Sequence, residues 1–230
     1  MAFSMAVIKG ERSADNCPCI DKNDAIMINE NVETIDWKSD HIRSLMMEVS
    51  GIDLYAVSEG LGASMTQGKL SLKCLGMEFL VDSSGGIRPE GHLSQWLNIL
   101  LLHYVRRGGS SPLSDKWVAF DELKGGLVKA SSFKRECEDP LRSFIDKDER
   151  TFNEAIELLG GERTEPVSSD EAWVIYPLPK VPFMVLYWRP DQEYSSELKV
   201  LFDSTADEYL DVESLIFLGE GLVEILDRMV

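Results

Sequence analysis

The chain has 230 residues, of which 44% are hydrophobic, and a formal net charge of −17. This length and composition suit one or two compact domains and exclude fibrous and disordered chains. Its 40 acidic against 23 basic side chains would repel a phosphate backbone or an anionic membrane surface, so we expect neither nucleic acid nor membrane as a partner.

The cysteines and the N-terminus bear on the cellular compartment. Cys17, Cys19, Cys74 and Cys137 are too few and too scattered for a disulfide scaffold, so we expect reduced thiols. The mildly apolar start of the chain lacks the preceding basic segment of an export signal. No apolar run elsewhere, Ile99 to Leu102 included, approaches the roughly 20 residues that span a bilayer. These features predict a cytoplasmic protein.

Residues 1–33 mix charged residues, Asn and Gly without a countable period, which predicts a flexible or loosely docked N-terminal arm. The arm contains Cys17-Pro18-Cys19, and two thiolates at this spacing can hold one metal ion or join an iron–sulfur cluster. His41 is a candidate third ligand. Such sites need four ligands, so the alternative is that Cys17 and Cys19 are incidental reduced thiols.

Helical and strand patterns begin after the arm. From Ser39, apolar residues recur every three or four positions up to Gly51, which predicts a helix. Lys69 to Leu75 and Glu78 to Val81 predict a hairpin, because both runs are rich in apolar residues and a glycine lies between them. Within the first strand of this hairpin, Cys74 is expected to be a small core residue.

The next helix is predicted over His92 to Arg106. It is apolar on almost every side, so we expect it to be buried on more than one face. His103 lies at the edge of its apolar stripe. It is either a hydrogen-bonded histidine at the boundary of the core or a titratable side chain that moves a proton in a cleft.

The middle of the chain is less regular. Trp117 to Phe120 reads as a short strand, and Ser131 to Arg135 as an irregular crossing. Cys137 is expected in a charged, exposed loop, since Pro140 is suited to open the helix that follows. No basic neighbour is implied that would lower the pKa of the Cys137 thiol.

Three consecutive strands are predicted over Ala172–Pro177, Pro182–Trp188 and Leu198–Asp203. The middle segment has no charge and no alternation of apolar with polar residues, so we expect a central strand that is covered on both faces. Short connections between the strands predict an antiparallel meander. Asp211 then caps the last helix.

A candidate site lies at the end of the central strand. Trp188 and Arg189 are suited to bind an anionic or flat ligand, and His103 or Asp203 to move a proton. The alternative is that Arg189, which precedes Pro190, simply leaves the sheet into water. The enzyme hypothesis requires that His103, Arg189 and Asp203 converge on one cavity.

Several short motifs lie along the second half of the chain and just before it. They are Leu101-Leu102-His103-Tyr104, Trp117-Val118-Ala119-Phe120-Asp121-Glu122-Leu123, Gly125-Gly126, Phe133, Leu201-Phe202-Asp203 and Tyr209-Leu210. Together they resemble the bacterial and archaeal family catalogued as domain of unknown function 3786, over about Trp37 to Leu226. The resemblance implies no assigned activity, an occurrence largely in anaerobes, and members with an additional cysteine-rich iron–sulfur segment. It therefore makes an iron–sulfur or other metal cofactor conceivable, but Cys17 and Cys19 alone cannot complete a cluster.

The patterns together predict an α+β fold: a mainly antiparallel sheet of five to seven strands with helices packed on its faces, as a single domain over residues 34–230. No phosphate-binding loop, nucleophile elbow or zinc-binding histidine pair is present. The leading functional hypothesis is therefore a binding or accessory protein, in the form of a homodimer, that recognises a protein partner or small ligand and is linked to anaerobic redox or cofactor metabolism. The alternative is an enzyme with the dispersed site described above.

Overall fold

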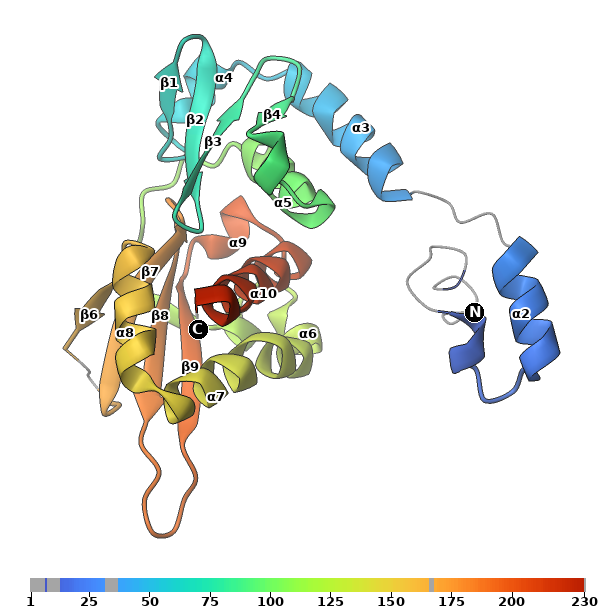
Figure 1. Cartoon of the computed structure of the whole chain (residues 1–230). Coiled ribbons are helices and arrows are strands. Elements are labelled where there is room, and N and C mark those ends of the chain that lie inside the picture. Colours follow the sequence, from blue (N-terminus) through green and yellow to red (C-terminus); the bar gives the residue numbers. More distant parts are fainter. Residues whose placement is uncertain (1–6, 8–12, 32–36, 166–167, 230) are drawn as a thin grey trace. The chain divides into compact units, whose positions relative to one another are not determined.

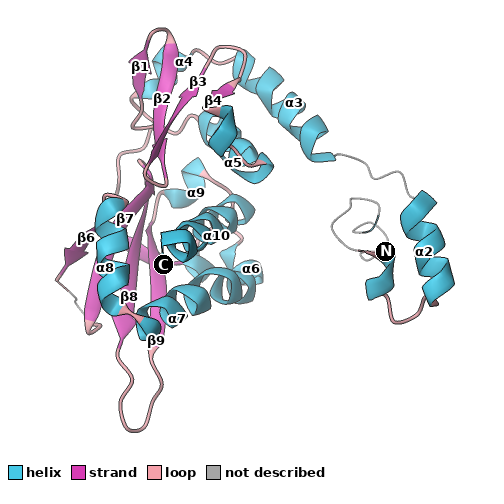
Figure 2. Ribbon diagram, in the orientation of Figure 1, coloured by secondary structure: helices cyan, strands magenta, loops and turns pink. Residues whose placement is uncertain are grey.

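The computed structural model describes residues 7, 13–31, 37–165 and 168–229. The chain divides into two units, Met1–Ser44 and Leu45–Val230. Helices and antiparallel strands are both abundant, which confirms the α+β class (Figures 1 and 2). Among the helices of the described ranges, none combines the length and the hydropathy that crossing a membrane requires.

The first unit contains a short helical turn, η1 (Ala14–Asn16), and the helix α2 (Lys22–Asn31). Its small core consists of Val7, Ala14 and Ala25. No period could be counted for α2, because apolar residues of this helix, such as Met27, are exposed as well as buried. The loose docking that was expected of residues 1–33 stays a prediction.

The other helices and the strands have the following bounds. The helices are α3 (Trp37–Ser50), α4 (Leu54–Ser58), α5 (Gln95–Arg107), α6 (Gly126–Phe133), α7 (Asp139–Lys147), α8 (Glu149–Leu158), α9 (Ala206–Tyr209) and α10 (Val212–Met229), with the shorter turns η2 (Glu90–His92), η3 (Phe120–Glu122) and η4 (Lys134–Glu138). The strands are β1 (Ser64–Thr66), β2 (Lys69–Cys74), β3 (Met77–Val81), β4 (Ile87–Arg88), β5 (Trp117–Ala119), β6 (Glu162–Thr164), β7 (Glu171–Leu178), β8 (Val181–Trp188) and β9 (Glu197–Asp203).

These strands form two antiparallel sheets instead of one. The smaller sheet has the order β1-β2-β3-β4, and the larger has the order β5-β9-β8-β7-β6. The predicted hairpin of β2 and β3 and the predicted meander of β7, β8 and β9 are both confirmed. The backbone N–H of Leu75 donates to the carbonyl of Pro177 at 2.8 Å, which joins the β2–β3 turn to the end of β7.

The central strand β8 is covered on both faces, one of them more completely than the other. Phe183, Val185 and Tyr187 on one face are at most 3% exposed. On the other face Pro182 and Leu186 are buried, and Met184 and Trp188 are half-buried. A run of apolar residues without alternation was therefore a reliable guide to the middle of this sheet.

Helices α7 and α8 lie along one face of the larger sheet (Figure 1). Trp173 of β7 packs edge-on against Phe152 of α8, with ring centroids 5.1 Å apart. Its indole N–H also donates to the Asn153 side chain at 2.7 Å. These contacts fix α8 on the sheet, and with it the adjoining α7 that bears on the candidate site.

The segment around Cys137 differs from the prediction. Residues read as an irregular crossing form α6 and the π turn η4, which leads directly into α7. Cys137 is fully buried against Gly219 of α10, and its thiol contacts the carbonyl of Ile216 at 3.6 Å. Burial raises the pKa of this thiol, and the nearby Glu220 raises it further. The prediction of an exposed cysteine is wrong, because Pro140 lies in the first turn of a helix that η4 already leads into.

Strand β9 has an edge that β5 covers only in part, since β5 pairs with Leu201 to Asp203 and no further. Beyond it, the Glu138 carboxylate accepts the backbone N–H of Val200 at 3.1 Å. Arg142 donates to the backbone carbonyl of Ser196 at 3.2 Å. Side chains of η4 and α7 therefore take the place of the missing strand. Burial raises the pKa of Glu138, whereas the Val200 N–H and Lys199 act against this rise.

Tyr104 of α5 ties two loops to the core. Its hydroxyl donates to the carbonyl of Leu61 at 2.8 Å and accepts the N–H of Lys180 at 3.2 Å. The side chain is fully buried, so no water can replace either bond. Its ring also stacks on Tyr209 with centroids 5.8 Å apart.

We expect Tyr104→Phe to lower the free energy of unfolding by about 1–3 kcal/mol, because it leaves a buried carbonyl and a buried N–H without their partner. Urea denaturation followed by circular dichroism measures this change. Tyr55→Phe is the matched control, since Tyr55 is 67% exposed. Equal midpoints for the two variants would contradict the assigned role of the Tyr104 hydroxyl.

Candidate ligand-binding site

Two adjoining cavities lie beside the loop that connects β8 to β9. The larger has a volume of about 650 Å³, and Lys134, Trp188 and Tyr194 are among its lining residues. The smaller has a volume of about 510 Å³ and includes Ile145 and Tyr187. Arg142, Arg189, Ser195 and Ser196 line both cavities. Both volumes fall in the range of small-molecule sites.

Helix α7 supplies three charged side chains to these cavities: Asp139 lines the larger cavity, Asp146 the smaller one, and Arg142 both. Arg142 and Asp146 are four residues apart, which places them on one face of the helix. Leu141 and Ile145 are buried and hold the helix on the sheet. The helix therefore presents the Arg142 cation and the Asp146 anion at a fixed spacing.

Asp146 is the centre of a small hydrogen-bond cluster. Its carboxylate accepts the hydroxyl of Tyr187 at 2.6 Å and the hydroxyl of Ser196 at 2.7 Å. Burial together with the Asp146 carboxylate raises the pKa of Tyr187 to about 12. Tyr187 therefore stays protonated at neutral pH and acts as a hydrogen-bond donor.

Arg189 lines both cavities, and Trp188 lines the larger one. The indole N–H of Trp188 donates to the carbonyl of Ser168 at 2.7 Å. Arg189 pairs with both carboxylate oxygens of Glu149, at 2.6 and 2.8 Å, and with Glu171 at 2.7 Å. The bond to Glu149 raises the pKa of Arg189. Its charge is thus largely neutralised within the protein.

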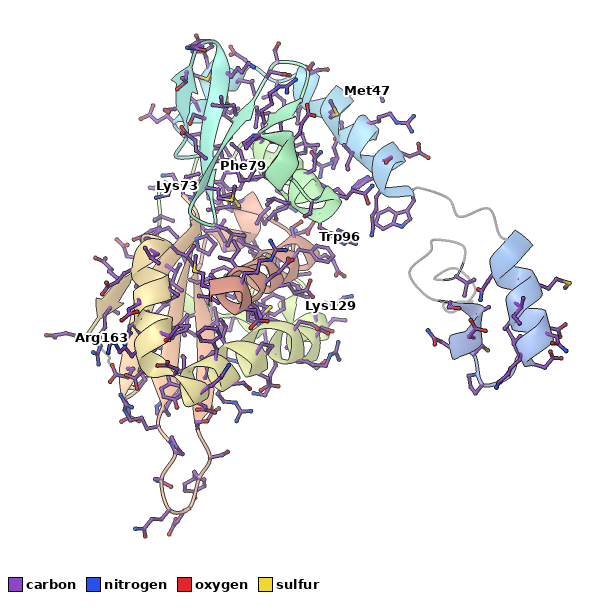
Figure 3. All side chains as sticks on the ribbon, in the orientation of Figure 1. Met47, Lys73, Phe79, Trp96, Lys129 and Arg163 are labelled. Atoms are coloured by element: carbon purple, nitrogen blue, oxygen red, sulfur yellow. The ribbon has the colours of Figure 1, made fainter. Side chains whose placement is uncertain are left out.

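Glu171 also pairs with Arg163, which lies on β6, an edge strand of the larger sheet (Figure 3). Glu149 and Glu171 together therefore balance the two arginines. This network fastens the first residue of the β8–β9 loop to β7 and α8, so Arg189 neither points freely into water nor offers its full charge to a ligand.

Asp203 lies at the other end of β9. Trp188 pairs with Glu197, six residues before Asp203, so Asp203 is about 20 Å from the cavities along the strand. Its buried carboxylate accepts the N–H groups of Ser114 at 2.9 Å, Asp115 at 2.8 Å and Thr205 at 3.0 Å. The hydroxyls of Ser114 and Thr205 donate to it as well. Asp203 thus holds two loops together.

His103 lies on α5 beside the start of α10. Its Nδ1 is 3.2 Å from the hydroxyl of Ser214 and 3.8 Å from the carboxylate of Asp211. A hydrolytic triad needs its hydroxyl and its carboxylate at opposite ring nitrogens, but here both face the same one. Asp211 also accepts the N–H of Ser214 at 2.8 Å, which confirms it as the cap of the last helix.

His103, Arg189 and Asp203 therefore do not form a joint site. Neither cavity beside the β8–β9 loop includes His103 or Asp203 among its lining residues. The condition that the enzyme hypothesis set, convergence on one cavity, is not met.

Cys17 is half-buried and Cys19 is exposed in the first unit. In the described part of the chain, no group of three or more His, Cys, Asp or Glu side chains is arranged to hold a metal ion. An iron–sulfur cluster needs more thiolates than this pair supplies. The other two cysteines are buried, as expected for Cys74, and burial raises the pKa of both thiols.

Sequence reasoning missed Arg142, Asp146 and Ser196. The helix that Pro140 opens was predicted, and the spacing of Arg142 and Asp146 on it was visible. The sequence does not indicate that Ser196 contacts both side chains, because Ser196 lies 54 residues from Arg142 in the chain. Only the folded β8–β9 loop brings this serine between the two charged groups.

Comparison with known proteins gives a family but no activity. No curated protein and no solved structure matches this chain. The model of one family, described as a domain of unknown function (DUF3786), matches residues 53–225. This match covers more than half of the chain and confirms the resemblance carried by the short motifs. The chain belongs to the DUF3786 family.

Proposed function

We propose that this chain is a cytoplasmic binding protein that recognises a small ligand with an anionic group in the cavities beside the β8–β9 loop. The observation that supports this proposal is the state of Arg142. Its guanidinium lies against both cavities, and most of its hydrogen-bonding capacity is unused.

A guanidinium has five N–H donors. One Nη of Arg142 donates to the Ser196 carbonyl at 3.2 Å, and the other is 4.0 Å from Asp139, beyond hydrogen-bond distance. Nε is buried and has no hydrogen-bond partner. Asp139 also pairs with Lys134 at 3.4 Å, so it offsets only part of the positive charge on this wall. Lys134 and Arg142 thus share the carboxylate of Asp139, while Asp170, Asp191 and Glu197 line other parts of the larger cavity.

An arginine in this state is suited to carboxylate or phosphate. Both groups match the planar fork of a guanidinium and form two parallel charge-assisted hydrogen bonds with it. Trp188 and Tyr194 add aromatic surface to the same cavity wall. These features favour recognition of a small anion with an apolar or flat part.

Binding is favoured over catalysis by the positions of the residues that were candidates for proton transfer. The histidine and the aspartate that were candidates for proton transfer lie away from the cavities.

We expect Arg142→Gln to weaken binding of small anions at least tenfold, because it removes a charge-assisted pair. Isothermal titration calorimetry with inorganic phosphate, citrate and adenosine monophosphate at low ionic strength measures the affinity. Arg150→Gln is the matched control, since Arg150 is a surface arginine on α8 that pairs with Glu154. Equal loss in both variants, or no binding of any probe to the native chain, would refute the proposal.

A further inference from the structure

The geometry of the smaller cavity points to a zwitterionic ligand of amino-acid type, with its carboxylate on Arg142 and its ammonium on Asp146. This inference rests on the proposed function and deepens it, because it adds a second charged group to the ligand. The observation that supports it is that two opposite charges lie on one helix face without forming an ion pair with each other.

Arg142 and Asp146 are one helical turn apart, and at this spacing oppositely charged side chains ordinarily pair. Here Ser196 lies between them. Its backbone carbonyl accepts from Arg142 at 3.2 Å, and its hydroxyl donates to Asp146 at 2.7 Å. The serine thereby holds the two charges apart, and both line the smaller cavity.

The other charged residues of this cavity also leave Arg142 and Asp146 without charge partners inside it. Its other charged residues, Arg189 and Glu149, neutralise each other through two hydrogen bonds. Among the residues with described placement, Asp146 forms no ion pair, and Arg142 approaches only Asp139, outside this cavity, at 4.0 Å. One positive and one negative charge therefore remain for a ligand to satisfy.

Both groups have hydrogen-bonding capacity left. The two oxygens of Asp146 offer about four lone-pair sites, and Tyr187 and Ser196 use two of them. An ammonium group has three donors and is suited to the remaining sites. The free donors of Arg142 are suited to a carboxylate.

The dimensions agree with a ligand of this class. Side chains four residues apart on a helix have their Cβ atoms about 6 Å apart, which allows one small molecule to reach both charged ends. The cavity of about 510 Å³ also has Ile145, Tyr187 and Pro190 in its wall, which offer apolar surface to the rest of the ligand.

The test titrates the full-length chain with each of the twenty common amino acids by calorimetry at low ionic strength and neutral pH. Each amino acid that binds is then compared with its decarboxylated amine and its deaminated acid. We expect both half-ligands to bind about ten- to a hundred-fold more weakly than the zwitterion, because each loses one charge-assisted contact. This comparison uses the native chain and so does not depend on a variant that folds.

Variants then show which residue binds the carboxylate of the ligand and which binds its ammonium group. Arg142→Gln should weaken the zwitterion and the deaminated acid but leave the amine unchanged, and Asp146→Asn should do the reverse. Arg142→Lys, which keeps the charge, should retain part of the affinity. Asp227→Asn, an exposed carboxylate of α10, is the control for Asp146→Asn.

Two outcomes overturn the inference and leave the proposed function in place. One is that a deaminated acid binds as tightly as its parent amino acid and depends on Arg142. The other is that phosphate or citrate binds through Arg142 while no amino acid binds. If neither amino acids nor simple anions bind, both proposals are refuted.

Discussion

Replacing Asp203 with asparagine is expected to lower the free energy of unfolding by about 3 kcal/mol, because charge-assisted bonds from two loops meet on this buried carboxylate. Ser114, Asp115 and Thr205 donate backbone N–H groups to it. An asparagine keeps one acceptor oxygen but turns an NH₂ group toward these donors. Urea denaturation at pH 7 measures the loss, and Asp227→Asn, which is exposed, should stay within about 0.5 kcal/mol of the native chain.

The loss should also depend on pH. Burial alone would raise the pKa of Asp203, but the hydrogen bonds from Thr205 and Ser114 outweigh it and hold the pKa below its usual value. A carboxyl with a lowered folded-state pKa contributes its stability fully above the unfolded-state pKa of about 3.9 and loses it as pH falls through the folded-state value. The difference between native chain and variant should therefore be full above about pH 5 and shrink below about pH 4. A difference that is constant from pH 7 to pH 3 would contradict this role of the charge.

Gly126→Ala is expected to lower the free energy of unfolding by about 3 kcal/mol or more, through a steric clash with the backbone. A Cβ at this position would lie 1.8 Å from the carbonyl oxygen of Phe120. Gly126 begins α6, which Leu123, Lys124 and Gly125 separate from the turn η3, and the carbonyl that Gly126 faces belongs to that turn. Because the clash involves main chain, the start of α6 must move away from η3 to relieve it.

Gly51→Ala is the matched control, since its Cβ would meet only ordinary contact, 3.5 Å from the carbonyl of Glu48. Thermal unfolding followed by circular dichroism compares the two variants. A Gly126→Ala protein that unfolds at the same temperature as the Gly51→Ala protein would mean that η3 and α6 accommodate the methyl group without cost.

The meander was predictable because its signal is local. The unbroken apolar run of β8 and the short connections on either side suffice to indicate a central antiparallel strand. The cap of α10 by Asp211 is local in the same way. Patterns of this kind depend on a few neighbouring residues, and they predicted the β7-β8-β9 meander of the larger sheet correctly.

The prediction that was wrong and the contacts that were not predicted both depend on segments that are distant in the chain. Cys137 is buried by α10, and nothing near it in the chain indicates this. The interaction of Asp203 with Ser114 joins residues 89 apart. Arg142 and Ser196 meet only through the packing of α7 on β9. The division of the strands between two sheets is equally tertiary, since each hairpin pattern is compatible with either arrangement.

The incomplete cover of β9 by β5 has a consequence for the behaviour of the protein in concentrated solution. Bare N–H and C=O groups on an edge strand invite the strand of another molecule, which begins aggregation. Glu138 occupies the N–H of Val200, and Arg142 occupies the carbonyl of Ser196. Turn η4 and helix α7, whose Arg142 lines the cavities, thus also hinder neighbouring copies from polymerising along this border.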